Sequence, residues 1–109
     1  MSFRVTAHRR AEEDIAQMST WLASQSPEGA ARWLDAYDHM IDQLRDNPLS
    51  FGLAPENELV DGEVRQAFFK TRRGRAYRAI FTIEGDHVRV LRVRSPGQGP
   101  TAPGELGIA

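Results

Sequence analysis

The sequence predicts an α+β domain with the element order β-α-α-β-β-β, in which a helix hairpin packs on one face of a twisted antiparallel sheet. Two observations predict this fold class. Apolar residues recur every three or four positions in the first half of the chain and every second position in the second half, and a stretch of turn-forming residues separates the two halves. With 109 residues, the chain is long enough for one domain with one core.

The first predicted elements are a short strand and a helix. Residues 3–6 alternate between apolar and polar side chains, which places Phe3 and Val5 on the inward face of a strand. The helix follows over about residues 8–24, with Thr6 as its expected N-cap and acidic residues in its first turns, where the helix dipole favours them. Its apolar residues form one stripe, made of Ala11, Ile15, Met18 and Leu22.

A second helix begins at the sequence Ser26-Pro27-Glu28. Serine is a good N-cap, and proline fits the first helical position because its missing N–H has no partner there. Asn47-Pro48 ends this helix. Two amphipathic helices joined by two or three residues are expected to form an antiparallel hairpin. Its apolar stripe consists of Ala30, Leu34, Tyr37, Ile41 and Leu44 and is widened by Trp33 and Met40. Trp33 and Tyr37 are expected to pack in the core.

Three strands are predicted after the loop over residues 48–62. They cover residues 64–69, 76–83 and 87–94, which are rich in β-branched and aromatic residues, and Glu84-Gly85-Asp86 supplies a tight turn. In the last strand Val88 and Val90 share one face while Leu91 and Val93 share the other. Two explanations remain open: both faces are covered, or a bulge shifts the alternation.

The domain is expected to span residues 1–95, followed by a flexible tail over residues 96–109. The tail holds three prolines and four glycines, a composition that buries little apolar surface. The chain has no cysteine, which excludes disulfides, thiolate metal sites and thiol nucleophiles, and no metal or cofactor is expected. No apolar run is long enough to span a bilayer and the start lacks the pattern of a signal peptide, so a cytoplasmic location is expected, without membrane contact.

Charge is distributed unevenly along the chain. Residues 1–61 carry five Arg and eleven Asp or Glu, whereas residues 62–109 carry nine Lys or Arg and four Asp or Glu. Arginine outnumbers lysine eight to one in the second part, which suits bidentate contacts with phosphate or carboxylate. We expect several of these side chains to converge on the sheet face or edge that the helices leave open: Arg65, Lys70, Arg72, Arg73, Arg75, Arg78, Arg89, Arg92 and Arg94. Pairing with acidic residues of the same chain, or charges that protect an edge strand at Arg89 and Arg92, are the alternatives.

Several short motifs, in this order and spacing, make residues 3–95 resemble the RelE/ParE superfamily of bacterial toxins, which includes plasmid stabilisation proteins. They are Ala11-x-x-Asp14-Ile15, Ser26-Pro27-x-x-Ala30, Asn47-Pro48, Val64-Arg65 and Gly74-x-x-Tyr77-Arg78. The resemblance implies the toxin of a type II toxin–antitoxin system, which inhibits growth and is neutralised by a cognate antitoxin encoded beside it. Members of the superfamily either cut mRNA in the ribosome or poison DNA gyrase. In the nucleases, the arginine that Arg78 matches acts on the phosphate, and Arg65 matches a frequent basic position.

The end of the last strand departs from the family pattern. Many relatives read Arg-His-Gly-Ala-Arg there, whereas this chain reads Arg94-Ser95-Pro96-Gly97-Gln98. A serine hydroxyl without a basic partner does not exchange protons near neutral pH, and RNA cleavage without a metal needs such an exchange. Neither His8, His39 nor His87 is an obvious replacement. Whether the chain is an enzyme, a metal-free endoribonuclease, is therefore left open by the sequence.

Three functions follow from this sequence. The leading one is a toxin that binds DNA gyrase or the translation machinery through an arginine-rich sheet face, with Lys70, Arg72, Arg73 and Arg75 as target-binding residues. The second is a ribosome-dependent mRNA endonuclease in which Arg65, Arg78 and Arg94 hold the phosphate. The third is a non-toxic relic of the fold that binds nucleic acid or protein. The expected partner is an antitoxin that folds as it wraps the toxin, in a hetero-oligomer.

Overall fold

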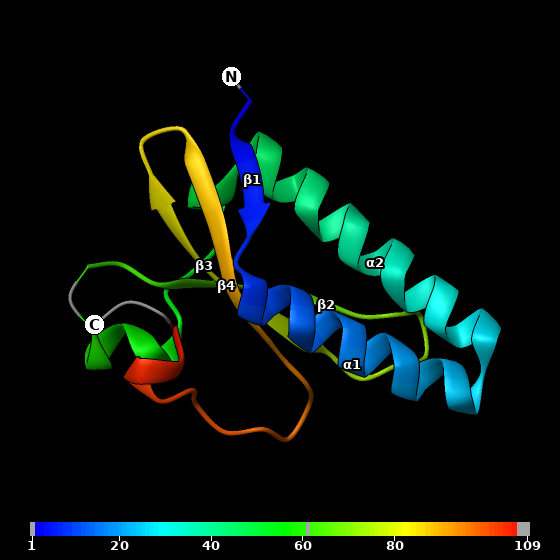
Figure 1. Cartoon of the computed structure of the whole chain (residues 1–109). Helices are drawn as coiled ribbons and strands as arrows, with labels where there is room; N and C mark the ends of the chain where they lie inside the picture. Colours follow the sequence, from blue (N-terminus) through cyan, green and yellow to red (C-terminus); the bar gives the residue numbers. More distant parts are fainter. Residues whose placement is uncertain (1, 61, 107–109) are drawn as a thin grey trace.

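The computed structural model describes residues 2–60 and 62–106, and it has the predicted element order (Figure 1). The fold class is α+β, as predicted. Two long helices lie together on one face of a four-stranded sheet, and three short 3-10 helices lie outside these elements. The elements are β1 (Arg4–Ala7), α1 (Arg9–Gln25), α2 (Pro27–Asp46), β2 (Arg65–Phe69), β3 (Tyr77–Glu84) and β4 (His87–Arg94), with 3-10 helices at Pro48–Ser50, Pro55–Leu59 and Pro103–Leu106.

The sheet is mixed rather than wholly antiparallel. Its strand order is β1-β4-β3-β2, and β1 pairs with β4 in parallel, with Val5 opposite Val88. The other two pairs are antiparallel. A parallel partner requires a long connection, and the helix hairpin together with β2 and β3 provides it. The first and last strands are therefore neighbours, and β1 and β2 form the two edges. Because β1 pairs with the first half of β4, the edge-protection explanation is wrong for Arg89. Arg92 lies beyond the end of β1, and its contacts are described below.

The N-cap of α1 lies two residues later than the predicted Thr6. Thr6 remains in β1, since the pairing with β4 continues through Ala7 and the His8 N–H donates to the Val90 carbonyl at 2.8 Å. His8 is the N-cap instead, and its Nδ1 accepts the Arg10 N–H at 3.1 Å. The predicted cap of α2 is confirmed: Ser26 Oγ accepts the Gly29 N–H at 3.0 Å.

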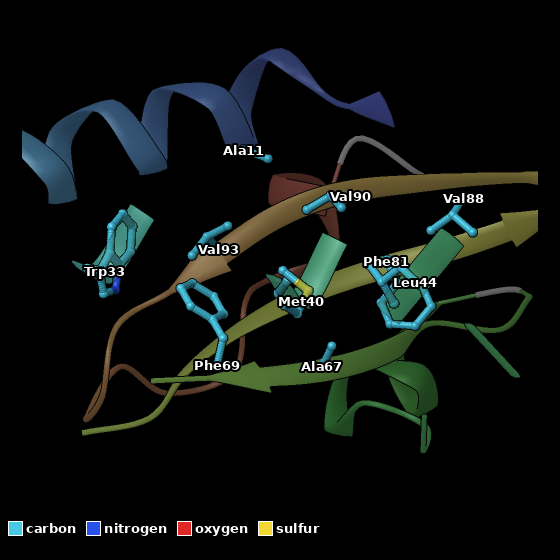
Figure 2. Packing of buried hydrophobic residues seen from close by; sticks show 11 residues of the cluster. Ala11, Trp33, Met40, Leu44, Ala67, Phe69, Phe81, Val88, Val90 and Val93 are labelled. Atoms are coloured by element: carbon cyan, nitrogen blue, oxygen red, sulfur yellow. The ribbon is translucent and has the colours of Figure 1, made fainter. Parts of the chain in front are cut away.

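The main core lies between the helix hairpin and the sheet (Figure 2). Trp33 is buried, and its ring packs against Phe69 and Tyr77 at centroid distances of 5.5 and 5.1 Å. Tyr37 packs edge-on against Phe69 at 5.5 Å. The prediction that Trp33 and Tyr37 belong to the core is therefore confirmed. Burial raises the pKa of Tyr37 to about 12, helped by the carboxylates of Asp38 and Glu12.

Both explanations for the pattern of β4 are correct. Val88, Val90 and Val93 pack under the helices, while Leu91 belongs to a second apolar cluster on the opposite face of the sheet. The register shifts at this point, because Ile80 of β3 lies opposite Arg92 and Phe81 lies opposite Val90. Leu91 is thus the extra residue of a bulge, and the bulge allows one strand to supply both layers.

The sheet face away from the helices is covered by the chain itself. The second cluster consists of Ala54, Val64, Ile80, Leu91 and Leu106. The 3-10 helix Pro55–Leu59 and the segment that follows β4 lie together here (Figure 1), and Thr101 and Leu106 are both buried. The flexibility of residues 96–109 stays a prediction, and residues 107–109 lie outside the described range. The sheet face that was expected to be open is therefore occupied.

Candidate functional site

The connection between β2 and β3 carries four basic side chains, Lys70, Arg72, Arg73 and Arg75, which we call the basic loop. All four are exposed. A turn closed by a hydrogen bond of 3.1 Å from the Gly74 N–H to the Thr71 carbonyl places Arg72 and Arg73 at its corner. A Cβ added at position 74 would collide with Thr71 Oγ1, so a larger residue there would force the Thr71 side chain to move. The turn thus holds two guanidinium groups away from the body of the domain.

Arg65, Arg78 and Arg94, which we call the strand arginines, have different surroundings. Arg78 on β3 lies on the covered face. There both terminal nitrogens of its guanidinium group donate hydrogen bonds to the carboxylate of Glu56, at 2.9 and 2.6 Å. The Glu56 side chain is 0% exposed and that of Arg78 is 13% exposed. Glu56 Oε2 also accepts the Thr101 N–H at 2.8 Å. One carboxylate therefore joins the loop before β2, the middle of the sheet and the segment after β4.

The protonation of Glu56 follows from these contacts. Burial by itself would raise the pKa of Glu56, but the hydrogen bonds from Arg78 and the Thr101 N–H, together with the charge of Arg78, lower it below its usual value. Arg78 and Arg94 also lie directly opposite each other on neighbouring strands. Like charges in that arrangement repel, so the ionised Glu56 carboxylate offsets an unfavourable pair.

Arg94 and Arg65 also make their contacts within the chain. Arg94 Nη2 donates to the Gly99 carbonyl at 2.8 Å. Arg65 donates to the Phe51 carbonyl at 2.6 Å and to Glu63 at 3.1 Å. Arg65 stands three residues from Phe68, which pairs with Arg78, so the alternation of a strand points Arg65 to the opposite face. The strand arginines therefore do not converge on one surface.

Arg92, in the part of β4 beyond the end of β1, is also paired with a carboxylate of the same chain. Its guanidinium group donates to both carboxylate oxygens of Asp14 on α1, at 2.7 and 2.9 Å. Asp14 also accepts the Val93 N–H at 3.0 Å, beyond the point where β1 ends. The hydrogen bond to Asp14, opposed by burial, raises the pKa of Arg92, and the charges of Asp14, Glu105 and Glu13 add to the rise. Arg92 further contacts Glu105, which anchors the segment after β4.

The comparison with protein families agrees with this architecture. Residues 5–99 match the model described as the ParE toxin of the type II toxin–antitoxin system, parDE. This match covers most of the chain. The chain belongs to the ParE toxin family. Among solved structures it is similar to a chain in the crystal structure of the RelBE2 toxin–antitoxin complex from Mycobacterium tuberculosis, with 23% sequence identity and a TM-score of 0.48 over 86% of this chain and 98% of that one. A comparison with curated proteins gave no match.

This ParE-family chain carries little acid–base chemistry beside Arg78 and Arg94. Ser95, in the place where many relatives have histidine, donates its main-chain N–H to Gln98 Oε1 at 2.7 Å in a turn. His8 caps α1, and His87 lies at the start of β4, where its Nε2 is 2.6 Å from Thr6 Oγ1. Over residues 2–60 and 62–106, no group of three or more His, Asp or Glu side chains could hold a metal ion, and no helix is long and apolar enough to cross a membrane.

The ParE-family fold also has an apolar groove that the sequence did not indicate. It has a volume of about 710 Å³ and lies between the end of the helix hairpin, the basic loop and the residues after β4. Trp33 and Tyr77 line it from inside, and Trp21, whose side chain is largely exposed, lines it from α1. Trp21 lies beside the predicted stripe of α1, and the groove that it lines also involves the basic loop, whose position the sequence does not reveal.

The alternative that arginines pair with acidic residues of the same chain is confirmed for Arg78 and Arg92, but the sequence did not identify their partners. Glu56 stands in a stretch of turn formers, and Asp14 was considered as an acid near the start of a helix and as part of a family motif. One signal could have found them. Arg78 and Arg92 alternate with apolar residues in predicted strands, and a guanidinium group buried in a sheet needs a carboxylate partner.

Proposed function

We propose that this protein inhibits growth by binding its cellular target through the basic loop, and that a cognate antitoxin neutralises it. The observation that carries the proposal is the contrast between the two sets of cations. Among the described residues, no carboxylate lies within 4 Å of the charged group of Lys70, Arg72, Arg73 or Arg75. The strand arginines, in contrast, donate to groups of the same chain.

The target has a negatively charged surface, and DNA gyrase and the translation machinery are the two candidates. Arg72 and Arg73 sit at the corner of one turn, so both guanidinium groups can reach the same phosphate or carboxylate row. The loop adds Lys70 and Arg75 on either side. Exposed cations of this kind increase the association rate with an acidic partner and fix its orientation.

RNA cleavage, which would depend on Arg78 and on a proton-transferring group near the end of β4, has less support. Stabilising a phosphate in the transition state requires a free cation, and Arg78 is already paired with Glu56 at 2.6 Å beneath the segment after β4. Proton transfer requires a group that titrates near neutral pH, and Ser95 has no basic partner among its hydrogen bonds within the described residues. Binding without cleavage therefore has the better support.

The test is induction of the chain in a bacterium, with and without the small gene encoded beside it. Arg72→Glu/Arg73→Glu is compared with Arg4→Glu/Arg9→Glu, which makes the same change of charge at exposed arginines near the start of the chain. We expect growth arrest with the unchanged chain and with the control variant, and at least a tenfold loss of toxicity with the loop variant. Unimpaired growth during soluble expression of the unchanged chain would favour the non-toxic relic.

Measurements on the arrested cells distinguish between DNA gyrase and the translation machinery as the target. Inhibition of gyrase leaves relaxed plasmids while protein synthesis continues at first, whereas a block of translation stops amino-acid incorporation at once. Mapping of a reporter message for ribosome-dependent cuts identifies the endonuclease. Cuts that persist in the loop variant and disappear in Arg78→Ala, at equal soluble levels, would overturn the proposal.

A further inference from the structure

The outer edge of β2 is only half covered. β2 is an edge strand, and residues 52–54 run along its first half. There the Ala54 N–H donates to the Val64 carbonyl at 2.8 Å, and the Gln66 N–H donates to the Gly52 carbonyl at 3.1 Å. The chain thus begins a fifth strand beside β2 and then leaves it.

The second half of the same edge has free main-chain groups. In a strand, the N–H and C=O of every second residue point to the same side, so those of Phe68 and Lys70 point outward, as those of Gln66 do. Residues 2–60 and 62–106 supply no main-chain partner for the Phe68 N–H. Phe68 as a whole is 58% exposed. Such an edge is a template for another extended chain.

A groove with a basic rim runs along this free half. It lies between α2 and β2 and has a volume of about 480 Å³. Met40 and Phe69 line its floor, and its charged residues are three cations and one acid, namely Arg32, Lys70, Arg72 and Asp35. Charge complementarity therefore favours an acidic segment with small apolar side chains at every second position.

We propose that an extended acidic segment of the antitoxin adds to the sheet beside Phe68 and Lys70, in line with residues 52–54. This inference rests on the proposed function and names the surface that the partner occupies. Main-chain hydrogen bonds supply affinity, and alternate side chains enter the groove over α2. Because Lys70 belongs to both the edge and the basic loop, and Arg72 lines the groove, the added strand lies against part of the basic loop. Binding at the edge thereby competes with the target for these cations.

Hydrogen exchange, measured residue by residue, tests the location. The probe is the complex of the full chain with the small protein encoded beside it, compared with the chain alone. We expect the amides of Phe68 and Lys70 to become at least tenfold slower to exchange in the complex. The amides of Ala67 and Phe69, which point to β3, are the internal controls and change less. Slowing confined to other surfaces, such as the groove at Trp21, would overturn the edge site and leave the proposed function intact.

A pair of substitutions at one position separates main chain from side chain. Phe68→Ala removes the ring and keeps the N–H, whereas Phe68→Pro removes both, and proline is tolerated on an edge strand when its nitrogen faces outward. We expect Phe68→Pro to bind the antitoxin roughly three- to tenfold more weakly than Phe68→Ala, as the loss of one hydrogen bond implies. Equal affinities at equal unfolding midpoints would contradict strand addition. If no complex forms and co-expression fails to restore growth, the proposed function itself fails.

Discussion

The strand arginines and the basic loop come from neighbouring parts of the chain, yet their surroundings are opposite. Arg78 is separated from Arg75 by two residues, and it is paired with a carboxylate that is 0% exposed. Arg75 is exposed at the rim of a groove. One set joins parts of the domain to one another and the other set extends into solvent. Positive charge in this protein is therefore found in two settings, internal pairs and an exposed loop, and we propose that the first serves stability and the second recognition. Substitutions can distinguish the two.

The largest expected effect follows from removing Glu56. Glu56→Ala leaves Arg78 buried without a carboxylate and the Thr101 N–H without its acceptor. Loss of one partner of a buried ion pair costs about 3–5 kcal/mol. Urea unfolding measures this loss, and Glu58→Ala, an exposed acid in the same 3-10 helix, is the matched control. A loss below about 1 kcal/mol would show that Arg78 is not held as described.

A smaller loss is expected from the second ion pair. Asp14→Ala removes both acceptors of Arg92 and the partner of the Val93 N–H. Because Arg92 stays close to Glu105, it remains partly compensated, and we expect a loss of about 2–3 kcal/mol in the free energy of unfolding. Glu13→Ala, one residue earlier on an exposed face of α1, is the control. Equal unfolding midpoints for the two variants would argue against the bridge.

Acid should lower the unfolding free energy of the domain through the Glu56 carboxylate. The pKa of Glu56 is lower in the folded chain than its usual value of 4.5. Its contribution to stability is therefore complete above that value and is lost as the pH falls through the folded pKa. The slope of stability against pH for one such group is at most about 1.4 kcal/mol per pH unit. Glu56→Gln should flatten this slope between pH 5 and the acid transition, and an unchanged slope would assign the acid sensitivity to other groups.

The smallest effect on stability is expected in the basic loop. Arg72→Ala/Arg73→Ala removes exposed side chains that have no ion pair among the described residues, so the unfolding free energy should change by less than about 0.5 kcal/mol. Toxicity should nevertheless fall strongly, because these cations are the proposed contact with the target. A loop variant that remains fully toxic would place target recognition elsewhere.

Much of the fold could be predicted from the sequence because local patterns determine it. Ser26-Pro27 fixes the start of α2, and Gly85, with φ +60, makes the two-residue turn between β3 and β4. The neighbours of β1 could not be predicted in this way, since its pairing with β4 depends on contacts far apart in the sequence. The packing of the segments around Glu56 and Thr101 over Arg78 could not be predicted either. Both segments are rich in turn formers, and that composition does not reveal where they pack.

The candidate site was predicted in composition more than in arrangement. Lys70, Arg72, Arg73 and Arg75 were expected near a turn, and the structure places all four there. The expected union with Arg65, Arg78 and Arg94 fails for a physical reason. A guanidinium group within a sheet has to be compensated close by, and the chain compensates each of these three with its own carboxylates or carbonyl groups.

The parallel pairing of β1 with β4 has a consequence for synthesis of the protein. Arg4 lies opposite His87, so the first strand has no neighbour in the sheet until the last strand has left the ribosome. At ordinary translation rates, this interval is roughly 4 to 17 s. During it the helix hairpin exposes the apolar side that later rests on the sheet. The sheet of a nascent chain is therefore incomplete until β4 has been translated.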